Sequence, residues 1–196
     1  MNLSLEKVWS EVGRDYIGGL INSESCFQAV LYKVLRDNLT DTTDTKVFVE
    51  PVIKYYENGS PQYKPDLVIC QNKKIIAIIE LKFAPNWNPK IKPDIDKLNI
   101  LASQKSMADK YYVARKPNTG EWEKKEYEIM ASSVFIIAVI GNYSSKSVNY
   151  NSIKSLISNM NYAQRFCLMS GKVYGENKEP EFDVEGSVDE IPINQW

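Results

Sequence analysis

The chain has 196 residues, of which 43% are hydrophobic and 25% are charged, and its formal net charge is −1. This composition is typical of a soluble globular protein, and the length suffices for one domain with a substantial core. Histidine is absent, which excludes a Ser-His-Asp or Cys-His triad, an HExxH metalloprotease and a nuclease with a histidine base, and which argues against a zinc site. Hydrolytic chemistry would therefore have to use carboxylates, lysines and a hard metal ion.

Targeting signals and cysteine pairs are also missing from the sequence. No apolar run approaches the roughly 18 residues that a membrane helix needs, and the acidic, amphipathic start is unlike a signal peptide. We therefore expect a cytoplasmic protein that makes no membrane contact. Cys26, Cys70 and Cys167 stand singly in apolar surroundings, which predicts buried free thiols rather than a disulfide framework or a zinc ribbon.

Two helices are predicted at the start of the chain. Apolar residues at helical spacing indicate a first helix over residues 3–15. Asn22 or Ser23 can cap a second helix that runs to about Asn38. Glu24 lies in the first turn of this helix, where the helix dipole favours an acid.

Three strands are predicted next. Residues 46–56 form the first, but Pro51 interrupts it and makes it a bent or edge strand. Two short apolar runs follow, at residues 67–70 and 75–79, and a polar turn at residues 71–74 separates them. These runs are rich in Val and Ile and predict a tight hairpin.

Charged residues stand at the open end of this hairpin. Because side chains alternate along a strand, Glu80 and Lys82 point to one face and Leu81 to the other. Asp66 lies across the hairpin, roughly opposite Glu80. Two carboxylates offer hard oxygen donors to a single cation, which suits Mg²⁺, and Lys82 would lie beside that ion, placed to steady an attacking water or the charge that develops on phosphorus.

The segment after the hairpin is a loop and then a helix. The loop, residues 84–92, contains Trp87 and Lys90, which are candidates to contact a nucleic-acid backbone or stack on a base. An ordinary connecting loop is the alternative. Asp94 can cap a helix that continues to about Tyr112.

The rest of the chain is predicted to alternate between polar and apolar segments. Residues 116–128 are a charged excursion, and residues 132–140 are the most apolar run, which indicates a central strand buried on both faces. A short helix over residues 151–161 and a hairpin over residues 164–174, turning at Ser170-Gly171, complete the expected elements.

The charge is distributed unevenly along the sequence. Residues 175–196 contain seven acids and one lysine, whereas the preceding 174 residues contain 23 bases and 18 acids. We expect residues 1–174 to form a single domain and residues 175–196 to form an acidic, partly irregular tail. The mildly basic body is compatible with a phosphate-backbone partner.

The hairpin and its charges resemble a known family. Pro65-Asp66, thirteen further residues and then Glu80-Leu81-Lys82 look like the signature of the PD-(D/E)xK nuclease superfamily, and the resemblance spans roughly residues 20–140. It implies an α/β fold with a restriction-endonuclease-like core. In this core a mixed sheet of four or more strands is flanked by helices, in the order helix, three strands, helix, strand.

The resemblance also implies an activity and a set of site residues. It implies a Mg²⁺-dependent nuclease, in which Mn²⁺ would substitute, acting on nucleic acid and in most members on DNA, without a nucleotide cofactor. Asp66 and Glu80 would bind the metal, and Lys82 would be catalytic. Glu24 would reach the metal site from the first core helix, with Gln28 beside it. The alternative interpretation is that Glu24 only complements the helix dipole.

The sequence leaves open which further residues support the site and whether the protein is an active nuclease. In the family a polar residue from the helix after the motif supports the site, and Lys97 and Gln104 are the candidates here, against a solvated helix face. An inactive nuclease-fold module that binds nucleic acid or protein is the alternative function, and a surface hairpin with ordinary charges is the alternative structure. The edge strand around Pro51 leaves a homodimer open.

Overall fold

The computed structural model describes residues 2–39, 44–54, 63–85, 89–103, 111–115, 122–143, 148–174 and 178–193. Its helices are α1 (Leu5–Ile17), α2 (Glu24–Asn38), α3 (Lys92–Ser103) and α4 (Tyr150–Ser158). Its strands are β1 (Asn2–Ser4), β2 (Thr45–Val49), β3 (Ile53–Lys54), β4 (Leu67–Gln71), β5 (Lys74–Ala84), β6 (Tyr111–Arg115), β7 (Trp122–Glu126), β8 (Glu128–Asn142), β9 (Phe166–Val173), β10 (Glu181–Gly186) and β11 (Glu190–Pro192).

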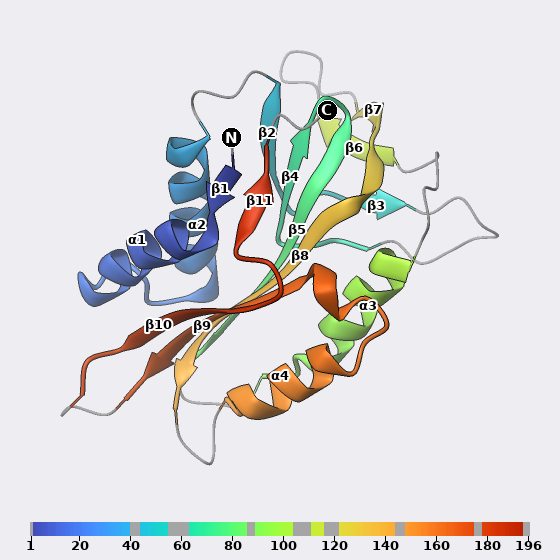
Figure 1. The fold of residues 1–196 in the computed structure, drawn as a ribbon. Coiled ribbons are helices and arrows are strands. Elements are labelled where there is room, and N and C mark those ends of the chain that lie inside the picture. The colour runs from blue at the N-terminus through green and yellow to red at the C-terminus, as the bar shows by residue number, and fades with distance from the viewer. Residues whose placement is uncertain are drawn as a thin grey trace.

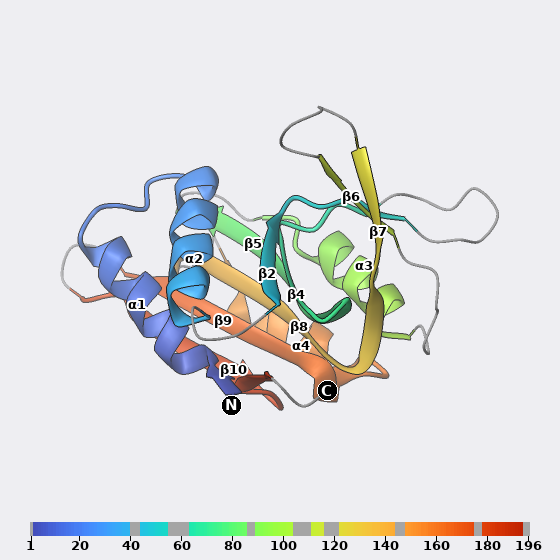
Figure 2. The ribbon, with the colours of Figure 1, turned by 90° about the horizontal axis from the view of Figure 1, so that it is seen from above.

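A six-stranded mixed sheet organises the molecule, with the strand order β10-β9-β8-β5-β4-β2. Helices α1 and α2 cover one face, and α3 and α4 cover the other (Figures 1 and 2). Strand β4 pairs antiparallel with both β2 and β5. Strand β8 pairs parallel with both β5 and β9. The order α2, β2, β4, β5, α3, β8 matches the order helix, three strands, helix, strand. The predicted mixed α/β fold with a restriction-endonuclease-like core is therefore confirmed.

The centre of the sheet is buried on both faces, as the apolar runs predict. Side chains of β5 and β8 contribute alternately to two clusters, one under α1 and α2 and the other under α3 and α4. Phe135 and Ile137 face the second cluster, while Ile136 and Ala138 face the first. Strands buried on both faces read as continuous apolar sequence, which is why the prediction for residues 132–140 is confirmed.

The first half of the chain agrees closely with expectation. The Ser23 side chain accepts a hydrogen bond of 3.2 Å from the Cys26 N–H and so caps α2. Strand β2 ends at Val49 and lies at the edge of the sheet, and the chain resumes as β3 at Ile53 in a separate sheet, β3-β6-β7. Pro51 thus breaks the strand as predicted.

Helix α3 is shorter than expected. Its described part ends at Ser103, and Tyr111 and Tyr112 belong to β6 rather than to a helix that reaches Tyr112. Arg165 fixes the end of α3 to the sheet, because its guanidinium donates hydrogen bonds to the main-chain oxygens of Ala102, Ser133 and Met130 at 2.8, 3.0 and 2.6 Å. This clamp holds α3 against β8.

The hairpin predicted for residues 164–174 is wrong. Phe166–Val173 is one continuous strand, β9, and Gly171 lies within it. A Cβ atom at Gly171 would come within 2.9 Å of the Phe182 ring, so the glycine serves close packing and not a turn. A glycine within an apolar run can mark either a turn or a close contact inside a strand, and the sequence alone does not distinguish the two.

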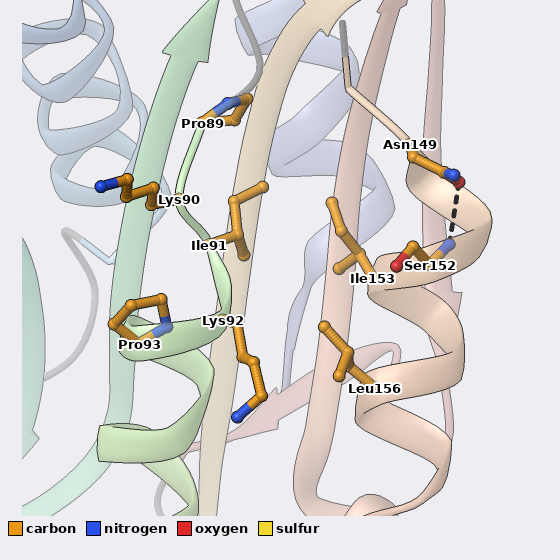
Figure 3. A pocket seen from close by; sticks show the side chains of 9 residues that line it. All are labelled: Pro89, Lys90, Ile91, Lys92, Pro93, Asn149, Ser152, Ile153 and Leu156. Carbon is orange, nitrogen blue, oxygen red and sulfur yellow. Dashed lines mark hydrogen bonds between the residues drawn. The ribbon is translucent and has the colours of Figure 1, made fainter. Parts of the chain in front are cut away.

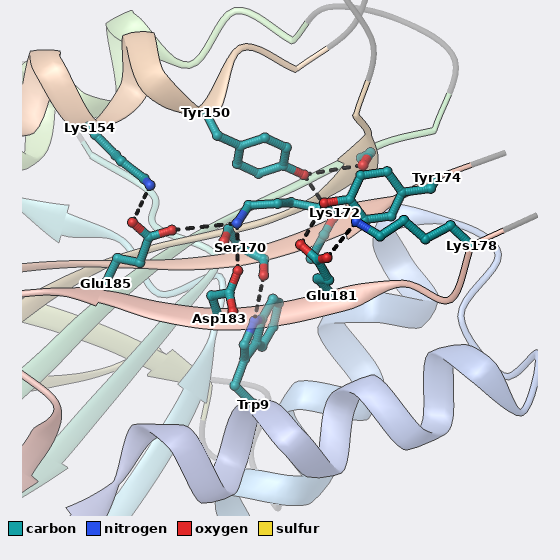
Figure 4. Close-up of polar contacts among 12 residues, drawn as sticks. Trp9, Tyr150, Lys154, Ser170, Lys172, Tyr174, Lys178, Glu181, Asp183 and Glu185 are labelled. Carbon is teal, nitrogen blue, oxygen red and sulfur yellow. Dashed lines mark hydrogen bonds and ion pairs between the residues drawn. The ribbon is translucent and has the colours of Figure 1, made fainter.

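Residues 175–196, which we expected to form an acidic, partly irregular tail, contain two strands, and each of them pairs into a sheet. Strand β10 pairs antiparallel with β9, and β11 pairs with β1. Along β10, Phe182 packs on the first cluster while Asp183 faces the other side and pairs with Lys172 at 2.5 Å. Glu185 bridges Lys172 and Lys154 on that same side (Figure 4). The acids therefore occupy one face of a strand.

Two further expectations concern the thiols and the membrane. Cys70 and Cys167 are buried and Cys26 is half-buried, so the prediction of buried free thiols is confirmed for two of the three. Burial raises the pKa of the Cys167 thiol to about 12. Within the described part of the chain, no helix combines the length and the apolar character that crossing a membrane requires.

The packing of β10 gives a test of the role of the C-terminal segment. Phe182 contacts the Trp9 ring edge-on, with ring centroids 5.4 Å apart, and also lies against Tyr16. We expect Phe182→Ala to lower the free energy of unfolding by about 3 kcal/mol, because it leaves a cavity between α1 and β9. Urea unfolding followed by circular dichroism measures this loss. The control is Leu20→Ala, an apolar truncation at an exposed position; equal midpoints for both variants would mean that the C-terminal segment does not stabilise the fold.

Candidate active site

The candidate site lies where β5 extends beyond β4. The register pairs Leu67 with Ile79, which places Asp66 directly across from Glu80 at the open end of the hairpin. Strand β5 continues to Ala84 without β4 beside it, although β8 still pairs with it on the other edge. The predicted opposition of Asp66 and Glu80 is thus confirmed by the strand register.

Along this edge, where β4 no longer pairs with β5, carboxylates accept hydrogen bonds from the β5 main chain. The Leu81 N–H donates to Asp66 Oδ2 at 2.7 Å, and the Phe83 N–H donates to Glu24 Oε2 at 3.1 Å. The two N–H groups are two residues apart, so they point to the same edge of the strand. The first turn of α2 therefore brings Glu24 to the open end of the hairpin.

Gln28 lies one helical turn after Glu24 and holds the other side of the same segment. Its Nε2 donates to the main-chain oxygen of Asp66 at 3.2 Å, and the Glu50 N–H donates to that same oxygen at 2.9 Å. Gln28 thus supports the position of Asp66, and any role of Gln28 toward metal or substrate stays a prediction.

Glu80 and Lys82 face α3, and Leu81 faces α2, as the alternation predicts. Leu81 belongs to the cluster under α1 and α2. Glu80 is only 6% exposed, and Tyr63 donates its hydroxyl hydrogen to Glu80 Oε1. Lys82 Nζ lies 3.1 Å from Asp94 Oδ2, in the first turn of α3.

The electrostatics of the acid pair follow from burial. Desolvation raises the pKa of Glu80 to about 8, and the neighbouring charges of Asp66 and Asp94 act in the same direction, whereas the Tyr63 hydroxyl and Lys82 oppose the shift. Burial also raises the pKa of Asp66, against the Leu81 N–H and Lys82. Two adjacent carboxylates with raised pKa values would both be stabilised in their charged form by a cation between them.

The Lys82 ammonium is held in its charged form. Burial by itself would lower its pKa, but Asp94, Glu24 and Glu80 outweigh burial and raise the pKa. Lys82 is therefore a fixed positive charge beside the acid pair at neutral pH.

The donor set suits a hard divalent cation in part. Asp66 and Glu80 provide two carboxylates side by side, and Mg²⁺ is commonly held by one or two carboxylates together with waters and phosphate oxygens. Among the described residues, no three or more His, Cys, Asp or Glu side chains form a group that could hold a metal ion. The role of Glu24 as a metal ligand therefore stays a prediction.

Two residues of this site escaped the sequence analysis. Tyr63 is buried and bonds Glu80, yet it stands in an irregular segment before β4, where no periodic pattern marks it. Asp94 was expected only as a helix cap, but α3 begins at Lys92, so Asp94 lies inside the first turn and turns toward Lys82. The only signal in the sequence was that Asp94 follows Pro93 at the start of the helix after the motif.

The remaining predicted residues divide into three cases. Lys97 approaches the site, with its Nζ 3.0 Å from Asp94 Oδ1 and 5.8 Å from the centroid of the Tyr63 ring. Lys90 is exposed and lines a cavity of about 400 Å³ between the loop before α3 and the start of α4, and Figure 3 shows its side chain pointing away from α4. Trp87 and Gln104 lie outside the described residues.

The order of the elements around the six-stranded sheet is the order that the motif resemblance implies. A comparison with protein-family models gives no match, and no curated protein matches the sequence. Two solved structures are similar to the chain, both of NucC in its cAAA-bound form. NucC of P. aeruginosa ATCC27853 is 9% identical over 95% of this chain and 86% of its own, with a TM-score of 0.44. NucC of E. coli MS115-1 is 10% identical over 92% and 79%, with a TM-score of 0.43.

The burial of Glu80 gives a prediction for the metal-free protein. The pKa of this carboxyl in the folded state, about 8, lies above its ordinary value of 4.5, so the folded state loses stability as the pH rises from 4.5 to about 8. We expect Glu80→Gln to equal the wild type near pH 5 and to exceed it by roughly 2–5 kcal/mol at pH 9, since the amide cannot ionise. Urea unfolding in EDTA at pH 5, 7 and 9 measures the difference.

The control for this experiment is Glu179→Gln, which changes an exposed acid in the same way. Its stability should follow the wild type at all three pH values. A Glu80→Gln curve that runs parallel to the wild type from pH 5 to pH 9 would contradict the raised pKa.

Proposed function

We propose that this protein is a metal-dependent nuclease that hydrolyses phosphodiester bonds of DNA. The observation that carries the proposal is the convergence of Asp66, Glu80 and Lys82 at the open end of one hairpin, with both carboxylates held by hydrogen-bond donors. Convergence of acidic groups with raised pKa values and one fixed cation is typical of catalytic sites. The motif resemblance supplies the reaction class.

The roles of the residues follow from their positions. Asp66 and Glu80 would hold Mg²⁺ through carboxylate oxygens, and Glu24 is the third candidate ligand. The bound ion supplies charge neutralisation at the scissile phosphate and a lowered pKa for a coordinated water. Lys82 donates a hydrogen bond to the attacking water or to a phosphate oxygen, and its ammonium stabilises the charge that develops on phosphorus.

Exposed lysines beside the site support a nucleic-acid substrate. Lys64 is 56% exposed and pairs with Glu50, and Lys97 is 52% exposed and pairs with Asp94. A phosphate group can replace the exposed carboxylate of Glu50 as the partner of Lys64 at little cost, because surface ion pairs contribute little. Such exchange would draw a polynucleotide backbone to the mouth of the site.

An inactive module that binds nucleic acid is the second candidate function. It is favoured by the internal bonds that already engage all three acids, namely Leu81 to Asp66, Phe83 to Glu24 and Tyr63 to Glu80. In such a module the carboxylates would stabilise only the strand edge, and no metal would be required. Metal binding and cleavage therefore separate the two candidates.

The test is a cleavage assay on supercoiled plasmid, single-stranded DNA and single-stranded RNA, with Mg²⁺, Mn²⁺ or EDTA. We expect cleavage that needs the metal and that falls at least about 100-fold in Asp66→Asn, Glu80→Gln and Lys82→Met, since each removes charge at the reacting phosphate. Glu179→Gln should retain wild-type activity. Cutting by all four variants at the wild-type rate would refute the assigned site.

Calorimetric titration with Mn²⁺ on the same proteins provides the second measurement. We expect one ion to bind the wild type, with affinity reduced at least tenfold in Asp66→Asn and Glu80→Gln. If the wild type neither cleaves any substrate nor binds Mn²⁺, the nuclease proposal is wrong and the binding module takes its place.

A further inference from the structure

Asp94 joins two lysines from different elements at the edge of the candidate site. Its Oδ2 lies 3.1 Å from Lys82 Nζ on β5, and its Oδ1 lies 3.0 Å from Lys97 Nζ on α3 itself. Each carboxylate oxygen thus has its own ammonium partner. Lys97 lies three residues after Asp94, on the adjacent turn, so the helix itself brings this pair together.

The position of Asp94 is rigid for three reasons. Its side chain is only 15% exposed, and that of Lys82 is 19% exposed, so the pair is shielded from water. Ile95 and Leu98, which follow in α3, are buried against the sheet at 1% and 0% exposure. Asp94 also lies in the first turn of the helix, where the dipole stabilises a negative charge.

A lysine beside an acid pair needs such an anchor. The long side chain of Lys82 loses rotamer freedom when it is fixed, and the carboxylates of Glu24 and Glu80 also attract its charge. An ammonium that folded onto Glu80 would occupy the oxygens proposed to bind the cation. Asp94, in the first turn of α3, offers the ammonium a different partner.

We infer that Asp94 is a positioning residue: its ion pair holds the Lys82 ammonium so that it does not fold onto the carboxylates of the acid pair and can reach the reacting phosphate. The inference rests on the proposed function, since Lys82 acts on substrate only if the protein is a nuclease. In this inference Asp94 acts through Lys82 and is assigned no direct role toward metal or substrate. Lys97 shares its carboxylate and keeps the side chain from rotating.

The chain offers a matched control on the same helix. Asp96 lies two residues after Asp94, is 56% exposed and pairs with Lys92 at 2.6 Å. The substitutions Asp94→Asn and Asp96→Asn therefore make the same chemical change, and each breaks a lysine pair of α3. The first alone affects Lys82.

Steady-state cleavage kinetics form the first part of the test. We expect Asp94→Asn to lower kcat about 10–100-fold with KM changed less than about threefold, the usual range for partners that orient a site residue. Asp94→Glu retains a carboxylate and should recover part of kcat, while Asp96→Asn should match the wild type. A kcat for Asp94→Asn within twofold of the wild type, or a change in KM alone, would overturn the inference.

A second measurement does not depend on cleavage. The Lys82 side-chain ammonium is observed by ¹H–¹⁵N NMR at low temperature and mildly acidic pH, with Lys82→Met to assign its signal. We expect an ordered ammonium in the wild type and in Asp96→Asn, and a mobile or displaced one in Asp94→Asn, whose amide spectrum should otherwise show a folded protein. Equal order in Asp94→Asn and the wild type would overturn the inference even if kcat fell.

The two measurements separate this inference from the proposed function. If the wild type neither cleaves any substrate nor binds Mn²⁺, the nuclease proposal fails, and the NMR comparison alone decides whether Asp94 positions Lys82. If the wild type cleaves but Asp94→Asn retains both kcat and an ordered Lys82, only the positioning role is wrong.

Discussion

The extension of β5 past β4 is the constraint on which the site depends. At this open end the Leu81 and Phe83 N–H groups face an edge with no β4 partner, and Asp66 and Glu24 accept their hydrogen bonds. An N–H group left without an acceptor at a partly buried edge costs about 1–3 kcal/mol, so these acids have a structural role besides any chemical one. The substitution Asp66→Asn keeps an acceptor oxygen for the Leu81 N–H and removes only the charge. Asp66→Ala would remove both, so its effect could not be assigned to the structural or to the chemical role.

The charge balance at this end of the hairpin favours a divalent partner. Asp66, Glu80 and Asp94 are all buried or half-buried, and Lys82 is the half-buried base among them. Fully ionised, these four groups carry two net negative charges, the charge that one divalent cation would neutralise. In the metal-free protein the balance is met differently, since burial raises the pKa of Glu80 to about 8 and keeps a proton on this carboxyl at neutral pH.

Sequence periodicity predicted the parts of the fold that are determined locally. The β4–β5 hairpin, the central strand β8 and the cap of α2 at Ser23 all carry short-range patterns, and the structure confirms them. Asp66, Glu80 and Lys82 could be placed because alternation and a tight turn fix their faces. The sequence therefore anticipated the framework of the site, from α2 to β5.

The elements that sequence reasoning missed depend on contacts between distant segments. Tyr63 reaches Glu80 from an irregular segment, and Asp94 reaches Lys82 from the start of the next helix, so neither lies at a periodic position. In β10 the alternation of Phe182 with Asp183 was present in the sequence, but the count of acids concealed it. A strand whose outer face is acidic has the same composition as a disordered acidic tail, and only its apolar partners distinguish the two.

The internal hydrogen bonds of the acids are also compatible with a metal site. A carboxylate has two oxygens with about four lone-pair sites, so one donor on each leaves capacity for a cation. Leu81 donates to one oxygen of Asp66, and Tyr63 donates to one oxygen of Glu80. Ligating carboxylates in metal sites are commonly oriented by such donors, which raises the precision of the site. The same bonds that stabilise the strand edge would therefore also direct both carboxylates toward one ion.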